Sequence, residues 1–366
     1  MPKAVIVGAG INGLCTARAL HRRGWAVEVV EAGPVPNPQA ASWDRHRMFR
    51  VHYPEPEMAA RMRDALAAWE ALWLDLGRSH YVERGTLALS RTAGDWSERT
   101  RTALAAVGAP LEQIEVAELS RRFPMLETAG VRYGLWSPQG GALMSDRILE
   151  DLVAWLRAAG AAVHPEVPVT AVDPATGVAS GPEGNFSGDV TILAAGVGLP
   201  RLVPDLAGDL VPHRCTVVYL RPSPAWAAAW TVGPAWVDLG GEEVLWGLPP
   251  IGDVPLKLGF GLETRPADPL VERDAGPADI CRIVAAYRGR FRDVEAFEPV
   301  AAVANFYLAA AEERFVLRGD RRMLVLSADS GHGFKFGPLT GEEVAAAINA
   351  GTTAALGRRW AGSPGA

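Results

Sequence analysis

The chain opens on apolar runs separated by turns of small residues. Residues 4–7 form an unbroken apolar run, which is typical of a short buried strand. Apolar residues then recur at helical spacing from Leu14 to Arg23, and Gly24 follows as a stop signal. A second apolar run at 27–30 ends at Glu31. The pattern predicts a strand–helix–strand unit at the start of the chain.

Later segments alternate between the two periodicities. Seven apolar residues fall on one face of a predicted helix over 56–76: Met58, Met62, Ala65, Leu66, Trp69, Leu72 and Trp73. Further helices are predicted at about 111–119, 146–159 and 340–355, and Glu342 and Glu343 suit the first turn of the last one. Short strands are predicted at 162–172, 189–195, 216–220, 243–248, 256–260 and 323–326.

The order of these elements predicts an α/β fold. A βαβ start, a β-rich middle and a return to α/β indicate a Rossmann-type nucleotide-binding domain with an inserted, mainly antiparallel β domain. We expect the nucleotide-binding domain to comprise residues 1–84, 142–210 and 318–366. We expect the inserted substrate domain to comprise residues 85–141 and 211–317.

Composition narrows the class of protein. The 366 residues are 49% hydrophobic and 21% charged, and the net charge of -6 argues against binding to nucleic acid or an anionic membrane. The three cysteines, Cys15, Cys215 and Cys281, are far apart and follow no metal-ligand spacing, so a reducing compartment is expected. No signal peptide fits before the first strand. We therefore expect a cytoplasmic protein without a membrane span, as a monomer or small homo-oligomer.

The first turn carries a dinucleotide fingerprint. Gly8, Gly10 and Gly13 follow a strand and open a helix, and Glu31 ends the next strand. Gly8 permits the tight turn, Gly10 lets the backbone approach a pyrophosphate, and Gly13 allows close helix–strand packing. Glu31 suits hydrogen bonds to ribose hydroxyls. A βα turn with incidental glycines is the alternative, and the fingerprint alone does not separate FAD from NAD.

Four further segments carry a resemblance that is more specific than the glycines. They are residues 47–53 (RMFRVHY), 189–198, 246–260 and 330–338 (SGHGFKFGP). Together they resemble the D-amino-acid-oxidase superfamily of flavoenzymes, and most closely its monomeric sarcosine oxidase and N-methyltryptophan oxidase branch. The resemblance runs from Lys3 to about Ile348. It implies FAD-dependent oxidation of the C–N bond of a small amino acid to an imine, with oxygen reduced to hydrogen peroxide.

The resemblance also implies roles for single residues. Arg47 would lie beside the flavin ring, and Arg50 and Lys335 would bind the substrate carboxylate. A planar guanidinium suits that task because it makes two parallel hydrogen bonds. Lys257 would activate oxygen, since a fixed ammonium stabilises superoxide as it forms. Arginines in a surface loop and a lysine reaching out of an edge strand are the alternatives.

The remaining site residues are implied in the same way. Tyr307 and Trp246 would line the substrate pocket, and the backbone of Val167 would meet the adenine. His332 is taken as a structural residue of its turn. The predicted FAD-binding set is Gly8, Gly10, Ile11, Asn12, Gly13, Glu31, Ala32, Ser42, Arg47, Met48, Val167, Ala195, Gly196, Gly331, Gly333, Phe334 and Lys335.

The sequence departs from the branch at several positions. Asn305 stands where the branch carries the cysteine that attaches FAD, and no cysteine is close to it in sequence, so noncovalent FAD is predicted. Trp246 replaces a tyrosine, and Gly261 and Trp43 replace histidines, which puts sarcosine as the substrate in doubt. Three other functions stay open: a flavin dehydrogenase with another electron acceptor, a nicotinamide-dependent dehydrogenase, and a noncatalytic flavin-binding subunit.

Overall fold

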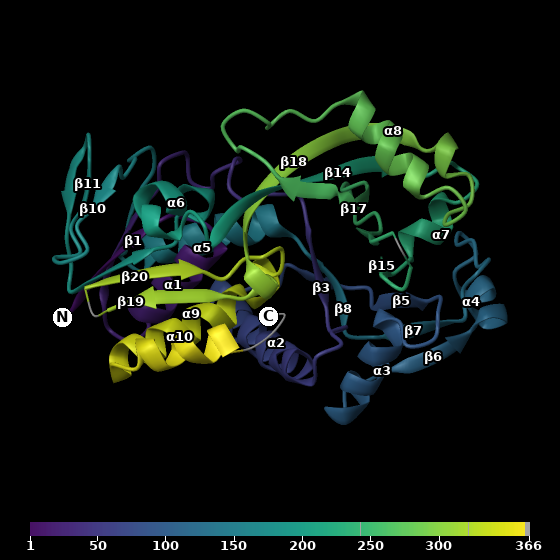
Figure 1. The fold of residues 1–366 in the computed structure, drawn as a ribbon, viewed down its shortest axis with the longest axis horizontal. Helices are drawn as coiled ribbons and strands as arrows, with labels where there is room; N and C mark the ends of the chain where they lie inside the picture. The colour runs from purple at the N-terminus through teal and green to yellow at the C-terminus, as the bar shows by residue number, and fades with distance from the viewer. Residues whose placement is uncertain (242, 321, 363–366) are drawn as a thin grey trace.

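The computed structural model describes residues 1–241, 243–320 and 322–362, and it is elongated with a sheet at each end (Figure 1). The first end holds a six-stranded sheet in the order β19-β20-β13-β1-β2-β9. All neighbours in it are parallel except β19 and β20. Its strands are β1 (Lys3–Val7), β2 (Ala26–Val30), β9 (Ala162–His164), β13 (Val190–Leu193), β19 (Val316–Gly319) and β20 (Met323–Ser327).

Helices pack around this mostly parallel sheet, either against its strands or against one another. They are α1 (Ile11–His21), α2 (Pro56–Leu76), α5 (Ser145–Ala158), α9 (Gly333–Ala350) and α10 (Thr353–Gly362). Helix α1 is buried on nearly every side, as its small and apolar residues require. It crosses α9 closely, because a Cβ on Gly341 would lie 2.5 Å from the Cys15 backbone. This packing holds the start of α1, which carries the glycine fingerprint.

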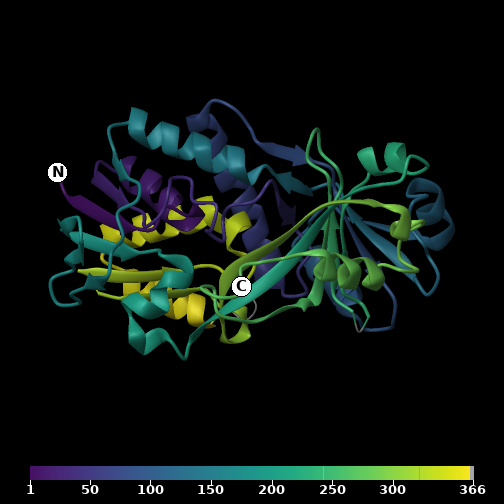
Figure 2. The same ribbon diagram turned by 90° about the horizontal axis from the view of Figure 1, so that it is seen from above.

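The second end holds an eight-stranded sheet in the order β18-β14-β17-β16-β15-β5-β7-β6. Only the β15–β5 pair is parallel. Its strands are β5 (Thr86–Ser90), β6 (Glu112–Glu115), β7 (Tyr133–Ser137), β14 (Leu210–Arg221), β15 (Ala235–Asp238), β16 (Leu245–Leu248), β17 (Leu256–Pro266) and β18 (Glu298–Ala310). The long strands β14 and β18 run from this sheet toward the first end (Figure 2).

Two small antiparallel sheets and several short helices complete the fold. The sheets are β3 (Arg47–Arg50), β8 (Gly140–Leu143) and β4 (Tyr81–Glu83), and β10 (Ala171–Val172), β11 (Ala179–Gly181) and β12 (Gly184–Phe186). The helices are α3 (Trp96–Ala106), α4 (Val116–Arg122), α6 (Leu199–Leu202), α7 (Ala227–Thr231), α8 (Pro277–Ala286) and the 3-10 turns η1 (Gly196–Gly198), η2 (Pro204–Leu206), η3 (Val294–Ala296) and η4 (Ala311–Glu313).

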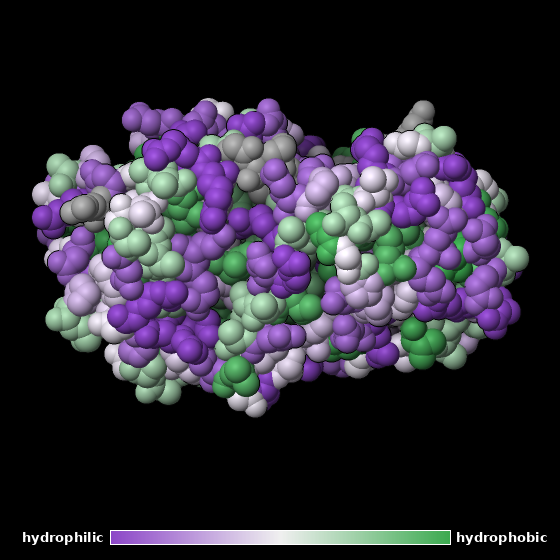
Figure 3. All heavy atoms as spheres, turned by 90° about the horizontal axis from the view of Figure 1, so that it is seen from below, coloured by the Kyte–Doolittle hydropathy of each residue, from purple (hydrophilic) through white to green (hydrophobic). Residues whose placement is uncertain are grey.

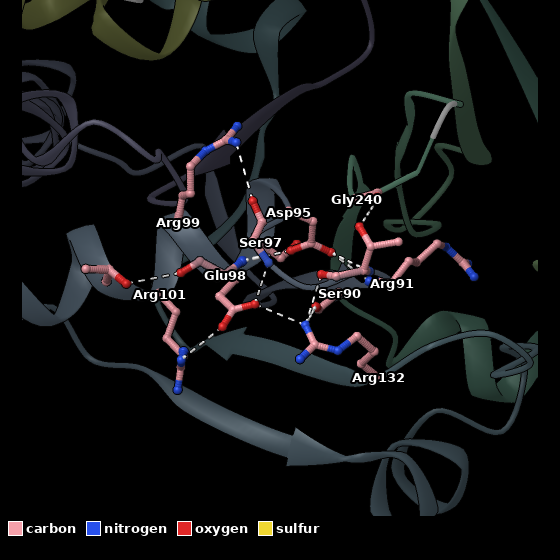
Figure 4. A network of polar contacts seen from close by, with 12 residues as sticks. Ser90, Arg91, Asp95, Ser97, Glu98, Arg99, Arg101, Arg132 and Gly240 are labelled. Carbon is pink, nitrogen blue, oxygen red and sulfur yellow. Dashed lines mark hydrogen bonds and ion pairs between the residues drawn. The ribbon is translucent and has the colours of Figure 1, made fainter.

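A polar network joins α3 to the second sheet (Figure 4). Asp95 caps α3 by accepting a 2.9 Å hydrogen bond from the Glu98 amide, and it also accepts one of 2.7 Å from the Arg91 amide. The Arg91 side chain forms a 2.6 Å ion pair with buried Asp238 on β15. The network ties α3 to β15 through Arg91 and Asp95.

The predicted fold class is confirmed, and the helix at 56–76 has the predicted bounds. Two helices differ. Residues 112–115 form β6 instead of helix, because they pair with β7, and the helix follows at Val116–Arg122. The last long helix starts at Gly333, so Glu342 and Glu343 lie in its third turn, where they pair with Arg18 and Arg61.

Strand lengths also differ from the sequence pattern. The predicted strand over 162–172 is two separate strands, β9 and β10, while β14, β17 and β18 extend beyond their apolar runs. Long antiparallel partners extend these strands, since each added residue gains a ladder hydrogen bond. The boundaries of the two predicted domains stay a prediction.

Polar residues cover most of the face shown in Figure 3, with scattered apolar groups. None of the helices in the described part of the chain combines the length and apolar character that a membrane span needs.

Candidate active site

A cavity of about 2050 Å³ lies between the two ends and is lined by residues from both. All the residues of the predicted site except Gly13 line it. Gly13 instead packs under the turn, where an added Cβ would lie 2.0 Å from the Gly8 carbonyl oxygen. The fold therefore gathers segments that are far apart in the sequence around one cavity.

The nucleotide end of the cavity is organised by short hydrogen bonds around the fingerprint. The Ala9 amide donates to Glu31 Oε2 over 2.8 Å, and the Ile11 amide donates to Ser42 Oγ over 2.9 Å. Glu31 also accepts from the Gly33 amide at 3.1 Å and from Asn37 at 2.9 Å. Glu31 thus fixes the turn as well as facing the cavity, and its carboxylate retains capacity to accept a further hydrogen bond.

This end fits a dinucleotide cofactor. Gly10, Ile11 and Asn12 line the cavity at the N-terminus of α1, and the start of a helix favours phosphate. Asn12 Oδ1 and Arg47 Nε line the same cavity and are buried without a hydrogen-bond partner in the described residues. Buried polar atoms are rarely left unpaired, so these two indicate a polar ligand.

A second part of the cavity holds two cations, Arg50 and Lys335. We call Arg50, Tyr53, His332 and Lys335 the Lys335 region. Lys335 lies in the first turn of α9, is 6% exposed, and places Nζ 3.3 Å from the His332 carbonyl oxygen. Arg50 donates to the His52 carbonyl and lies 4.2 Å from the Tyr53 ring centroid. Neither cation forms an ion pair with a carboxylate in the described part of the chain.

The charge state of this region follows from burial. Burial, and then the charge of Arg50, hold the pKa of Lys335 well below its usual value. Burial lowers the pKa of His332 to about 4, so its ring is neutral near pH 7. Glu313 and Asp329 also act on Lys335 from a distance, but neither forms an ion pair with it in the described residues. A buried ammonium and a half-buried guanidinium without a directly paired carboxylate favour the binding of an anion such as a carboxylate.

His332 has more contacts than a structural turn residue needs. Its Nδ1 lies 3.1 Å from the Tyr53 hydroxyl, and its Nε2 lies 2.7 Å from Glu313 Oε2. The Glu313 side chain is 63% exposed, so a chain of hydrogen bonds links the Lys335 region to solvent. Sequence reasoning missed Glu313, which follows β18 and carries no motif.

Lys257 lies in a third part of the cavity and is fully buried. Strand β17 lies between β14 and β16, so the alternative of a lysine reaching out of an edge strand is wrong. Its Nζ lies 2.5 Å from Asp44 Oδ2 and 3.1 Å from the His46 carbonyl oxygen. Asp44 precedes the arginine motif in an irregular segment, and no motif in the sequence pointed to it.

Asp44 is the centre of this third part, which we call the Lys257 region: Asp44, Arg47, Tyr219, Lys257 and Asn305. Its carboxylate also accepts hydrogen bonds from the Tyr219 hydroxyl and, over 3.4 Å, from the Asn305 side-chain amide. Its Oδ2 lies 3.3 Å from Arg47 Nη1. Burial alone would raise the pKa of Asp44, but Lys257 and Arg47 outweigh it and lower that pKa below its usual range. The carboxylate is therefore ionised.

Asn305 lies beside a cysteine in the fold, although no cysteine is close to it in the sequence. Asn305 on β18 pairs with Cys215 on β14, and both line the cavity. Directly paired residues of antiparallel strands point to the same face, so the Cys215 thiol lies beside the amide. Burial raises the pKa of Cys215, which keeps the thiol protonated.

The remaining pocket positions are Tyr307, which matches the branch, and the three replaced positions Trp246, Gly261 and Trp43. Tyr307 stacks on His213 with ring centroids 6.0 Å apart, and the Trp246 ring centroid lies 5.8 Å from Lys257 Nζ. Gly261 lines the cavity, where an added Cβ would lie 2.6 Å from Val244 Cβ, so the glycine leaves room for that valine. Trp43 does not line the cavity, and its carbonyl accepts from Arg47 over 3.0 Å.

The sequence profile of the DAO family, described as FAD dependent oxidoreductase, matches residues 3–347. This chain belongs to that family. Membership confirms the predicted superfamily and the FAD-dependent oxidoreductase class, and it sets aside the nicotinamide-dependent alternative. The polar end of the cavity around Gly10 and Glu31 is accordingly the expected place for the adenosine and pyrophosphate of FAD.

Individual relatives are distant but cover nearly the whole chain. This FAD-dependent oxidoreductase is 23% identical over 352 residues to N-methyl-L-tryptophan oxidase of Yersinia pestis. The aligned residues cover 93% of each chain. Its structure resembles NikD, described as an unusual amino acid oxidase essential for nikkomycin biosynthesis, with a TM-score of 0.79, 21% identity and coverage of 95% and 94%. It also resembles glycine oxidase from Geobacillus kaustophilus, with a TM-score of 0.80, 19% identity and coverage of 96% and 95%.

Proposed function

We propose that this protein oxidises the C–N bond of a small amino acid to an imine and passes the electrons to oxygen, forming hydrogen peroxide. The observation that carries the proposal is the pair of cations, Arg50 and Lys335, without a carboxylate partner in the same cavity as the nucleotide end. A cavity that binds FAD and also an organic anion suits an amino-acid substrate. The names of the relatives agree with this substrate class.

The predicted residues would hold the cofactor without a covalent bond. FAD, when bound, accepts the two electrons of the oxidation. We assign its binding to the discontinuous domain of residues 1–84, 142–210 and 318–366, and the substrate side of the cavity to residues 85–141 and 211–317. Asn305 cannot form a thioether, which supports noncovalent attachment. The neighbouring thiol of Cys215 makes that point worth testing directly.

The substrate would be oriented by its carboxylate. Arg50 and Lys335 bind this group, and Tyr307 and Trp246 enclose the rest of the molecule. The replaced positions Trp246 and Gly261 change the surroundings of the amine, so we expect a secondary, primary or cyclic amino acid other than sarcosine. The cytoplasmic location and the monomeric or small homo-oligomeric state stay predictions.

A dehydrogenase that uses another electron acceptor is the second candidate. The ion pair between Lys257 and Asp44 favours it, because a paired ammonium attracts a second negative charge less strongly. Rapid reoxidation of the reduced enzyme in air would support the oxidase, and slow reoxidation would support the dehydrogenase.

The first experiment is an absorption spectrum of the purified protein before and after acid precipitation, on wild type and Cys215→Ser. We expect a yellow protein whose colour moves into the supernatant in both, followed by peroxide formation with members of an amino-acid panel. Colour that stays with precipitated wild type but leaves Cys215→Ser would overturn noncovalent attachment and identify Cys215 as the link. A colourless protein that FAD cannot reconstitute would overturn the proposed activity.

A further inference from the structure

Asp44 is a fully enclosed carboxylate that the proposed reaction does not itself require. It is 6% exposed, and four side chains from four different strands contact it: Arg47, Tyr219, Lys257 and Asn305. Tyr219 and Lys257 are direct partners across β14 and β17, so the two strands present both groups to the same carboxylate. Such a complete set of partners fixes the position of Asp44 and, through it, of Lys257.

The charges around Lys257 explain why a carboxylate is needed there. The groups that face it are Asp44, Arg47, the His46 carbonyl, the Tyr219 ring and the Cys215 thiol. Among the described residues that act on Lys257, Asp44 is the one ionised carboxylate, while Arg47 adds a second positive charge. Burial and Arg47 both favour the neutral amine, and Asp44 opposes them.

We propose that Asp44 is a positioning residue that keeps the Lys257 ammonium charged and oriented toward the cavity. The proposal rests on the oxidase function proposed above, because that function gives Lys257 its task. With Asp44 in place, Asp44, Lys257 and Arg47 together carry one positive charge. Without it they would carry two, close together and away from water, so Lys257 would lose its proton at a lower pH.

The first test is a stability cycle that needs no turnover. Thermal unfolding is measured for wild type, Asp44→Asn, Lys257→Met and the double variant, each with its FAD content. Lys257→Met leaves Asp44 buried beside Arg47 alone, so we expect the double variant to melt at a higher temperature than Lys257→Met. If the change in melting temperature of the double variant equals the sum of the changes in the two single variants, the pairing of Asp44 with Lys257 is overturned.

The second test separates a positioning role from a structural one. The rate constant for oxygen with the reduced enzyme is measured against pH, together with the midpoint potential of the bound flavin. We expect Asp44→Asn to move the ionisation that controls the oxygen reaction downward by about one pH unit or more. We also expect a more positive midpoint potential, because a nearby negative charge has been removed.

Two further variants, together with the double variant of the first test, show whether the pH shift comes from the charge of Asp44 acting on Lys257. Tyr219→Phe removes a hydrogen bond from Asp44 but keeps its charge, so it should move the ionisation far less than Asp44→Asn. Asp238→Asn breaks the buried pair with Arg91 and should leave the profile unchanged. In a Lys257→Met background the Asp44→Asn change should cause no shift.

The failures of the two proposals can be told apart. A normal oxidase whose oxygen profile and potential are unchanged by Asp44→Asn would overturn this inference alone. A protein without FAD or turnover would overturn the proposed function.

Discussion

The two buried lysines of the cavity lie in contrasting surroundings. Lys257 has a carboxylate at 2.5 Å, whereas Lys335 forms no ion pair among the described residues and is influenced from a distance by Arg50, Glu313 and Asp329. A buried charge that is already paired is a fixed part of the protein, and one that is not paired is costly unless a ligand completes it. Both lysines line one cavity, and we propose that Lys257 acts on the reaction with oxygen while Lys335 binds the substrate carboxylate.

The largest expected effect on activity comes from removing the Arg50 side chain of the Lys335 region. Arg50→Ala should lower kcat/KM for a carboxylated amine by about 10³-fold, because a charge pair with the substrate is lost and Lys335 remains alone. The measurement is steady-state kinetics on the best substrate of the panel. Arg63→Ala, at a side chain that is 73% exposed, is the matched control, and equal kinetics for both variants would refute the carboxylate site.

The second effect tests the Lys257 region. Lys257→Met should slow the reaction of the reduced enzyme with oxygen by about 100-fold, because one fixed positive charge is removed from the developing negative charge. Reduction by substrate should change only a few-fold. Stopped-flow measurement of both half-reactions checks this, and the reverse order of effects would contradict the role of Lys257.

The third effect concerns the pH dependence of anion binding by Lys335. Lys335→Met should weaken the binding of an unreactive carboxylate such as acetate by about 10-fold. The protonated lysine binds the anion, and the pKa of Lys335 is lowered, so wild-type affinity should fall as pH rises through that lowered value. Titration of the flavin spectrum with acetate across pH should show this ionisation in wild type and not in Lys335→Met.

The smallest effect concerns a histidine beside each cation. The carbonyls of His46 and His52 accept from Lys257 and from Arg50, and burial lowers the pKa of both rings to about 3. Below about pH 6.5 these histidine rings become protonated in the unfolded chain but stay neutral in the folded protein. The free energy of unfolding should therefore fall as the pH drops below about 6.5. His52→Gln should reduce this loss by about 1 kcal/mol between pH 6.5 and 5.5. Urea unfolding at the two pH values checks it, and an unchanged loss would exclude His52 as a source.

The nucleotide end was accessible from the sequence because its parts are local. The fingerprint, the strands on both sides and Glu31 fall within one βαβ unit, where spacing along the chain dictates spacing in the fold. The arginine and Gly331–Lys335 segments were found by resemblance, and their residues line the cavity. The helix that carries Lys335 was placed too late, because glycines and Pro338 obscured its first turn.

The sequence by itself determined the α/β class, the family and most of the residues around the cavity. Tertiary structure alone decided that Asp44 pairs with Lys257, that Glu313 contacts His332, and that Cys215 lies beside Asn305. Asp44 and Lys257 are 213 residues apart in the chain, and no periodicity links them. The pairing depends on which strands become neighbours and in what register, and that is set by the burial of the whole core.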